Sequence, residues 1–158
     1  MIMLEKLKAQ VAPFVALRHD LHQHPELGLK EFRTSAIVAE RLKSWGYTVT
    51  TGLASTGLVA QLRRGTGAKR LGIRADMDAL PIQEHNTFAH RSVNDGVMHA
   101  CGHDGHTAML MAAAQHIAEE VEFSGTLNLI FQPAEEHPGG AKLMIEHARN
   151  SCRSTGVH

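Results

Sequence analysis

The residues best suited to chemistry lie between Met98 and Thr107, a stretch that holds three histidines, a cysteine and an aspartate. Cys101 and His103 are two residues apart and are flanked by glycines. On a helix this spacing would point the two side chains apart, whereas an extended or looped backbone points both the same way. A thiolate and an imidazole that converge suit zinc or a similar divalent metal. We therefore expect a loop that brings Cys101 and His103 to one metal.

Two adjacent carboxylates, Glu135 and Glu136, form a second candidate group. They follow an apolar run at residues 126–131, which should lie deep in a sheet, and glycines follow them. One carboxylate of such a pair can bind a metal while the other takes a proton from a metal-bound water. The alternative interpretation is a solvated acidic pair before a turn.

Asp76 and Asp78 end an expected strand and share one of its faces. The carboxyl ends of strands in open α/β sheets are common positions for ligand sites. These aspartates either close the strand and cap the next segment, or one of them orients a ligand histidine through a hydrogen bond.

The spacing alone leaves open which histidines bind, because His99, His103 and His106 also have helical separations. One Cys–His pair by itself more often indicates a buried cysteine and a hydrogen-bonded histidine. The clustering with Asp104 and the downstream Glu135–Glu136 pair favours a site instead. We expect the other histidines before residue 148 to be structural or surface residues: His19, His22, His24, His85, His90, His116, His137 and His147.

Length and composition indicate one globular domain. The 158 residues contain 16 basic and 16 acidic side chains, a balance that gives no indication of nucleic-acid or membrane binding. The two cysteines do not form a disulfide framework, and neither a signal peptide nor a membrane-spanning segment is expected. We therefore expect a cytoplasmic location.

The hydrophobic pattern alternates between helical and strand periods. Helices are expected at residues 4–21, with a kink or a division at Pro13, and at 29–45, 107–120 and 141–147. Asp104 or Thr107 is expected to cap the third of these. Strands are expected at 47–51, 58–63, 70–75 and 126–131, with the second and third forming a hairpin. The alternation predicts an α/β fold, a mixed sheet with helices on both faces.

Four motifs resemble one known family. They read RHDLHQHPELG at residues 18–28, RADMDALP at 74–81, HACGHDGHTA at 99–108 and QPAEE at 132–136. In this order they are similar to the amidohydrolase branch of the aminoacylase and carboxypeptidase G metallopeptidases, which contains hippurate hydrolases and N-acyl-amino-acid amidohydrolases. The resemblance implies a zinc-peptidase-like (phosphorylase/hydrolase-like) fold and a centre of two divalent ions, zinc or else manganese, cobalt or nickel.

The resemblance also implies residue roles. Cys101, His103 and Glu136 correspond to metal ligands, Glu135 to the general base, and Asp78 to the aspartate that orients the site. The implied reaction is hydrolysis of the amide bond of small N-acyl amino acids by a metal-activated water.

Family members are usually more than twice as long. We therefore expect residues 1–147 to be the N-terminal part of a truncated catalytic domain, residues 148–158 to be a non-matching tail, and the lid or dimerisation domain to be absent. Two further metal-binding histidines, and the homodimer possible in full-length relatives, belong to the missing part. The rival hypotheses are a catalytically incomplete fragment that binds metal or acts as a scaffold, and a cysteine hydrolase with Cys101 as nucleophile.

Overall fold

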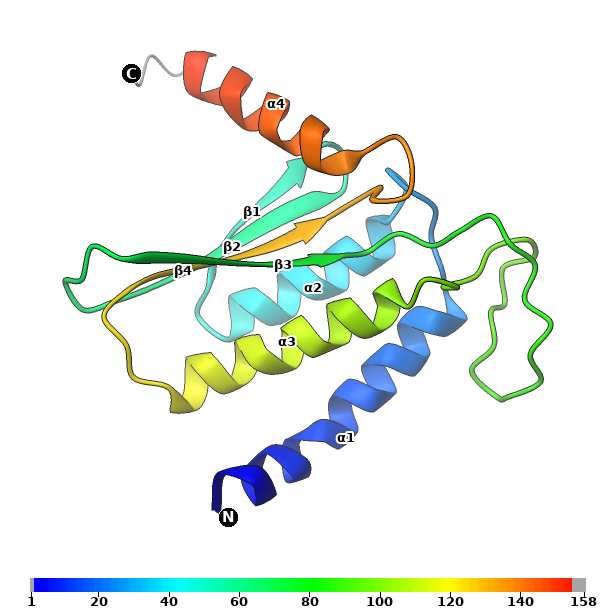
Figure 1. Cartoon of the computed structure of the whole chain (residues 1–158), viewed down its shortest axis with the longest axis horizontal. Coiled ribbons are helices and arrows are strands. Elements are labelled where there is room, and N and C mark those ends of the chain that lie inside the picture. The colour runs from blue at the N-terminus through cyan, green and yellow to red at the C-terminus, as the bar shows by residue number, and fades with distance from the viewer. Residues whose placement is uncertain (1, 155–158) are drawn as a thin grey trace.

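The computed structural model describes residues 2–154 (Figure 1). Its helices are α1 (Ile2–Gln23), α2 (Phe32–Ser44), α3 (His103–Glu120) and α4 (Gly140–Ser154). Its strands are β1 (Thr48–Leu53), β2 (Gly57–Arg64), β3 (Arg70–Asp76) and β4 (Gly125–Gln132). Among the described residues, no helix combines the length and the apolar character needed to cross a membrane.

The four strands form one mixed sheet in the order β1-β2-β4-β3. β4 pairs antiparallel with β2, placing Phe131 opposite Leu58, and parallel with β3, placing Phe131 beside Ala75. The expected hairpin between the second and third strands is therefore wrong. β4 lies between them, paired on both sides, and is the most completely buried strand, whereas the first half of β3 is exposed.

One face of the sheet packs against α2 and α3, and α1 packs against α3. The inward side chains of β2 and β4 meet those of the helices in a single cluster, with Leu58, Leu129 and Phe131 fully buried. On the opposite face, α4 lies over one end of the sheet and buries Met144 (Figure 1). The expected mixed α/β sheet with helices on both faces is thus confirmed.

Several expected helix boundaries are wrong. The division of the first helix at Pro13 is wrong, because α1 is one helix in which Pro13 is exposed while Leu17 and Leu21 anchor the helix in the core. The kink expected at Pro13 stays a prediction. The fourth helix does not stop at residue 147 but continues to Ser154, since residues 148–154 include neither glycine nor proline. α2 begins at Phe32, three residues later than expected.

α3 begins at His103 rather than Thr107. Gly102 occupies its N-cap with φ of 79°, a left-handed conformation that suits glycine. Neither side chain that we expected to cap the helix does so: Asp104 bonds to residues of other segments, and the Thr107 hydroxyl donates to the Asp76 carbonyl. Cys101 remains in the preceding loop, as expected.

The fold brings three chain segments to one edge of the sheet. β3 and β4 are parallel, so their carboxyl ends lie together, and the bond from Met77 N–H to the Gln132 carbonyl extends the pairing beyond the strands. The positive end of the α3 dipole points into the same region, where it favours anionic groups.

Candidate metal centre

Cys101, His103 and Glu136 converge at this edge of the sheet. One potential ligand atom from each lies within 4.8 Å of the other two. The His103 ring is buried, whereas Cys101 and Glu136 are exposed, and His103 Nε2 lies 3.9 Å from Glu136 Oε1. Residues far apart in sequence thus present sulfur, nitrogen and oxygen donors to one point.

His103 is held in one orientation by Asp78. Its Nδ1 lies 2.9 Å from the Asp78 carbonyl oxygen and 3.2 Å from Asp78 Oδ1. Because both oxygens accept hydrogen bonds, Nδ1 carries the proton and the lone pair is left on Nε2, the atom that faces Glu136. Burial opposes protonation of this ring, but the Asp78 hydrogen bond and the charges of Asp76 and Asp78 raise the pKa of His103 overall.

Asp78 also holds the loop that carries the carboxylates. Its Oδ2 accepts a 3.0 Å hydrogen bond from the Glu136 backbone N–H. Burial opposes ionisation, but the bonds from His103 and from the N–H groups of Glu135 and Glu136 lower the pKa of Asp78. One buried carboxylate therefore connects the ligand histidine to the Glu135–Glu136 loop.

The surroundings of Cys101 are acidic. The hydrogen bond to Glu136 is the largest effect and, with burial and the charges of Glu135 and Asp78, raises the pKa of the Cys101 thiol to about 11. Catalytic cysteines are found in electropositive surroundings that lower the thiol pKa. This environment disfavours the cysteine-hydrolase hypothesis and suits a thiol whose sulfur binds a cation as the proton is released.

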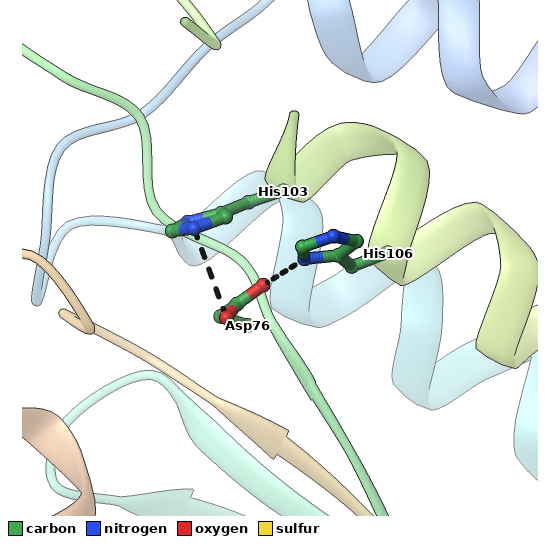
Figure 2. Close-up of side chains that lie close together, drawn as sticks. All are labelled: Asp76, His103 and His106. Atoms are coloured by element: carbon green, nitrogen blue, oxygen red, sulfur yellow. Dashed lines mark hydrogen bonds and ion pairs between the residues drawn. The ribbon is translucent and has the colours of Figure 1, made fainter. Parts of the chain in front are cut away.

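A second group of potential ligands consists of Asp76, His103 and His106 (Figure 2). Asp76 Oδ1 lies 2.7 Å from His106 Nδ1, and its Oδ2 lies 3.7 Å from His103 Nε2. The Arg74 guanidinium also contacts Asp76 Oδ2, at 2.8 Å. Because Asp76 already has a cationic partner and His103 Nε2 can bind only one ion, the geometry favours the group with Cys101 and Glu136.

The donor set fits a divalent metal of the zinc type. A thiol, an imidazole with its lone pair turned inward and a carboxylate are ordinary ligands of Zn²⁺, and three protein ligands leave a coordination position open. Glu135, the predicted base, is exposed and adjacent in sequence to Glu136.

The structure shows two supports that the sequence patterns did not reveal. The His22 ring bridges two buried carboxylates, with Nδ1 2.9 Å from Asp104 Oδ2 and Nε2 3.1 Å from Glu84 Oε1. Glu31 is fully buried and accepts a hydrogen bond from the Ala134 N–H. His22 belongs to a noticeable cluster of histidines, but nothing in the pattern around Glu31 distinguishes it from an exposed acid.

Comparison with known proteins tests the family resemblance. The sequence profile of Peptidase family M20/M25/M40 matches residues 72–158. The chain belongs to this family. It is 51% identical over 133 residues to the hippurate hydrolase of Campylobacter jejuni, a match that covers 84% of this chain and 34% of that protein. It is 44% identical over 146 residues to the N-acyl-L-amino acid amidohydrolase of Geobacillus stearothermophilus, covering 91% and 39%.

A solved structure agrees with this membership. The YXEP protein of Bacillus subtilis, described as a dinuclear metal-binding peptidase of the M20 family, superposes with a TM-score of 0.82 at 39% identity. The superposition covers 89% of this chain and 40% of that one. This M20 chain therefore spans between a third and two fifths of the length of these relatives.

Proposed function

We propose that this M20 chain provides part of the active site of a metal-dependent amidohydrolase that cleaves N-acyl amino acids. The observation that carries the proposal is the convergence of Cys101, His103 and Glu136 beside Glu135. The names of the two relatives, a hippurate hydrolase and an N-acyl-L-amino acid amidohydrolase, support this substrate class.

In the proposed reaction, Cys101 Sγ, His103 Nε2 and a Glu136 carboxylate oxygen would hold one divalent ion. The ion, when bound, polarises the acyl carbonyl and lowers the pKa of a water molecule. A second ion, in keeping with the dinuclear relative, would use the two further histidines that the family resemblance implies. Zinc, manganese, cobalt and nickel all suit such ligands.

Glu135 is the proposed proton carrier. It removes a proton from the attacking water as the oxygen forms a bond to the acyl carbon. As the carbon–nitrogen bond breaks, Glu135 gives that proton to the departing nitrogen. The products are a carboxylic acid and a free amino acid, so atoms and charges balance.

The test combines metal content with hydrolysis of benzoylglycine and N-acetyl amino acids, for the wild type, Cys101→Ala and Glu135→Gln. We expect the wild type to bind metal and hydrolyse substrate, and Cys101→Ala to lose both. Glu135→Gln should keep its metal while hydrolysis falls about 100- to 10,000-fold, the usual contribution of a general base.

Each other outcome identifies a rival. Metal binding without hydrolysis would favour the incomplete fragment that only binds metal. Hydrolysis that survives metal removal by a chelator but ends on thiol alkylation would favour the cysteine hydrolase.

A further inference from the structure

Glu31 is a carboxyl group with no exposure to solvent, directly before α2. Both of its oxygens accept hydrogen bonds. Oε1 accepts from the Ala134 N–H at 2.8 Å, and Oε2 accepts from the Thr56 hydroxyl. A single side chain thus joins three segments that are distant in sequence.

An acid at this position is costly for the fold. Burial raises the pKa of Glu31, and the nearby Asp78 charge adds to that effect, although the hydrogen bonds to Thr56 and Ala134 oppose it. A buried polar cluster is often no more stable than apolar residues of similar size that replace all of its members together. Stability alone therefore does not explain a carboxyl group here, and the groups that it contacts must be considered.

The main contact of Glu31 is a strained point of the Glu135–Glu136 loop. Ala134 is buried and has φ of 50°, a left-handed conformation that is unfavourable for a residue with a Cβ. Its carbonyl accepts the N–H groups of Gly139 and Gly140, so the loop closes on this residue. The bond from Glu31 to the Ala134 N–H holds the strained residue in place.

The loop also sits tightly against the segment before Glu31. A Cβ added to Gly28 would lie 2.7 Å from the His137 carbonyl oxygen and 2.9 Å from the Ala134 Cβ, both too close for normal contact. The residues around Gly28 and Glu31 therefore form the surface on which the loop is shaped.

Glu135 lies between two fixed backbone points. On one side the Ala134 N–H is held by Glu31, and on the other the Glu136 N–H is held by Asp78. We propose that Glu31 is a positioning residue that sets the loop so that Glu135 and Glu136 face Cys101 and His103. This inference rests on the proposed function, because it assumes that the loop carries a metal ligand and a base.

Two substitutions separate positioning from charge. Glu31→Gln keeps the length of the side chain and an oxygen that can accept from Ala134, but removes the negative charge. Glu31→Asp keeps the charge but shortens the side chain by one methylene, away from Ala134. Thr56→Val is the matched control, because it removes the bond to Oε2 and leaves the Ala134 bond intact.

The readout is binding of Co²⁺ to the metal-free protein, measured by titration calorimetry and by the absorption band of cobalt bound to the Cys101 thiolate. Circular dichroism of each variant verifies the fold. We expect Glu31→Gln and Thr56→Val to bind within about threefold of the wild type. Glu31→Asp should bind about 10- to 100-fold more weakly, the usual effect of losing an outer support of a metal ligand.

Two results would overturn the assignment: wild-type affinity in Glu31→Asp, or affinity in Glu31→Gln reduced as much as in Glu31→Asp. A failure of the proposed function is distinguishable, because it appears in the wild type itself, either as the absence of a cobalt–thiolate band or as metal binding without hydrolysis. If Glu31→Asp does not fold, Glu31→Gln still tests the assignment, because a clear loss of cobalt affinity in that folded variant would overturn it.

Discussion

The candidate metal centre has two walls that are built differently. The histidine wall, residues 99–106, is held by hydrogen bonds between buried side chains: Asp78 fixes His103, and His22 fixes Asp104. The carboxylate wall, residues 133–140, is held through its backbone N–H groups, while Glu135 and Glu136 remain exposed. In the histidine wall, the ligand side chain of His103 is itself held. In the carboxylate wall, only the backbone that carries the ligand Glu136 is held.

The difference indicates how the site would close on an ion. In tetrahedral zinc coordination, a nitrogen and an oxygen ligand lie about 3.4 Å apart. His103 Nε2 and Glu136 Oε1 are 3.9 Å apart in the structure. The His103 ring is buried, and its Nδ1 faces two acceptor oxygens of Asp78. We therefore infer that the Glu136 side chain makes this small movement.

The largest effect should come from removing the fixed ligand. His103→Ala deletes the oriented nitrogen, and we expect metal affinity to fall more than the roughly 100-fold typical of losing an outer support. Glu136→Gln should cost less, because the amide oxygen remains a weak ligand on the adjustable wall. Calorimetric titration of both variants with Zn²⁺ makes the comparison. Equal losses would show that the two walls do not differ as described.

A substitution behind the histidine wall should affect folding most. His22→Leu leaves the carboxylates of Asp104 and Glu84 buried without their shared partner, and such losses cost about 3–5 kcal/mol. His24→Leu is the matched control, because His24 is part-exposed and directly follows α1, the helix that contains His22. This substitution should cost less than about 1 kcal/mol of unfolding free energy. Urea unfolding of both variants tests this. Similar free energies of unfolding would mean that the buried bridge contributes little.

A smaller effect is expected where the walls join. Asp78 accepts from His103 with one oxygen and from Glu136 N–H with the other, whereas the amide of Asp78→Asn offers only one acceptor. We expect metal affinity to fall about 10- to 100-fold. Asp76→Asn is the companion variant and should change affinity less. A larger loss in Asp76→Asn would move the metal to the group with His106.

The smallest effect concerns the anchor of α3, the helix that begins in the histidine wall. Tyr47 donates a 2.9 Å hydrogen bond to the Ala114 carbonyl, and burial raises the pKa of Tyr47 to about 12. The stabilisation of the folded state by protonated Tyr47 is complete below the pKa of tyrosine in the unfolded chain, about 10. This stabilisation is lost as the pH rises through the pKa of Tyr47 in the folded protein. At about pH 11 the loss should be about 1.4 kcal/mol.

Urea unfolding at about pH 8 and about pH 11 measures this loss, and Tyr47→Phe, which cannot ionise, should not show it. The same decline in both proteins would assign the effect to other groups.

The sequence predicted the elements better than their arrangement. The period of residues 107–120 predicts α3 because Leu110 and Ala114 both face the core. The sequence pattern does not predict that β4 separates β2 from β3, since strand order depends on pairing between residues far apart in the chain.

The same limit applies to the site. Cys101, His103 and Glu136 could be proposed from residue type and motif, and the structure brings them together, while the roles given to Glu135 and Asp78 stay predictions. Glu31 could not be proposed, because its importance depends on burial and on the conformation of Ala134.

The central position of β4 has a consequence for the order of folding during synthesis. The hairpin of β1 and β2 is local and can form as soon as both strands leave the ribosome. β3 must wait, because its only strand neighbour among the described residues is β4, which is made after the whole of α3. Until then the nascent chain leaves unpaired the edges of β2 and β3 that β4 later covers, and these edges can associate with other chains, so protection by a chaperone matters most in the interval between β3 and β4.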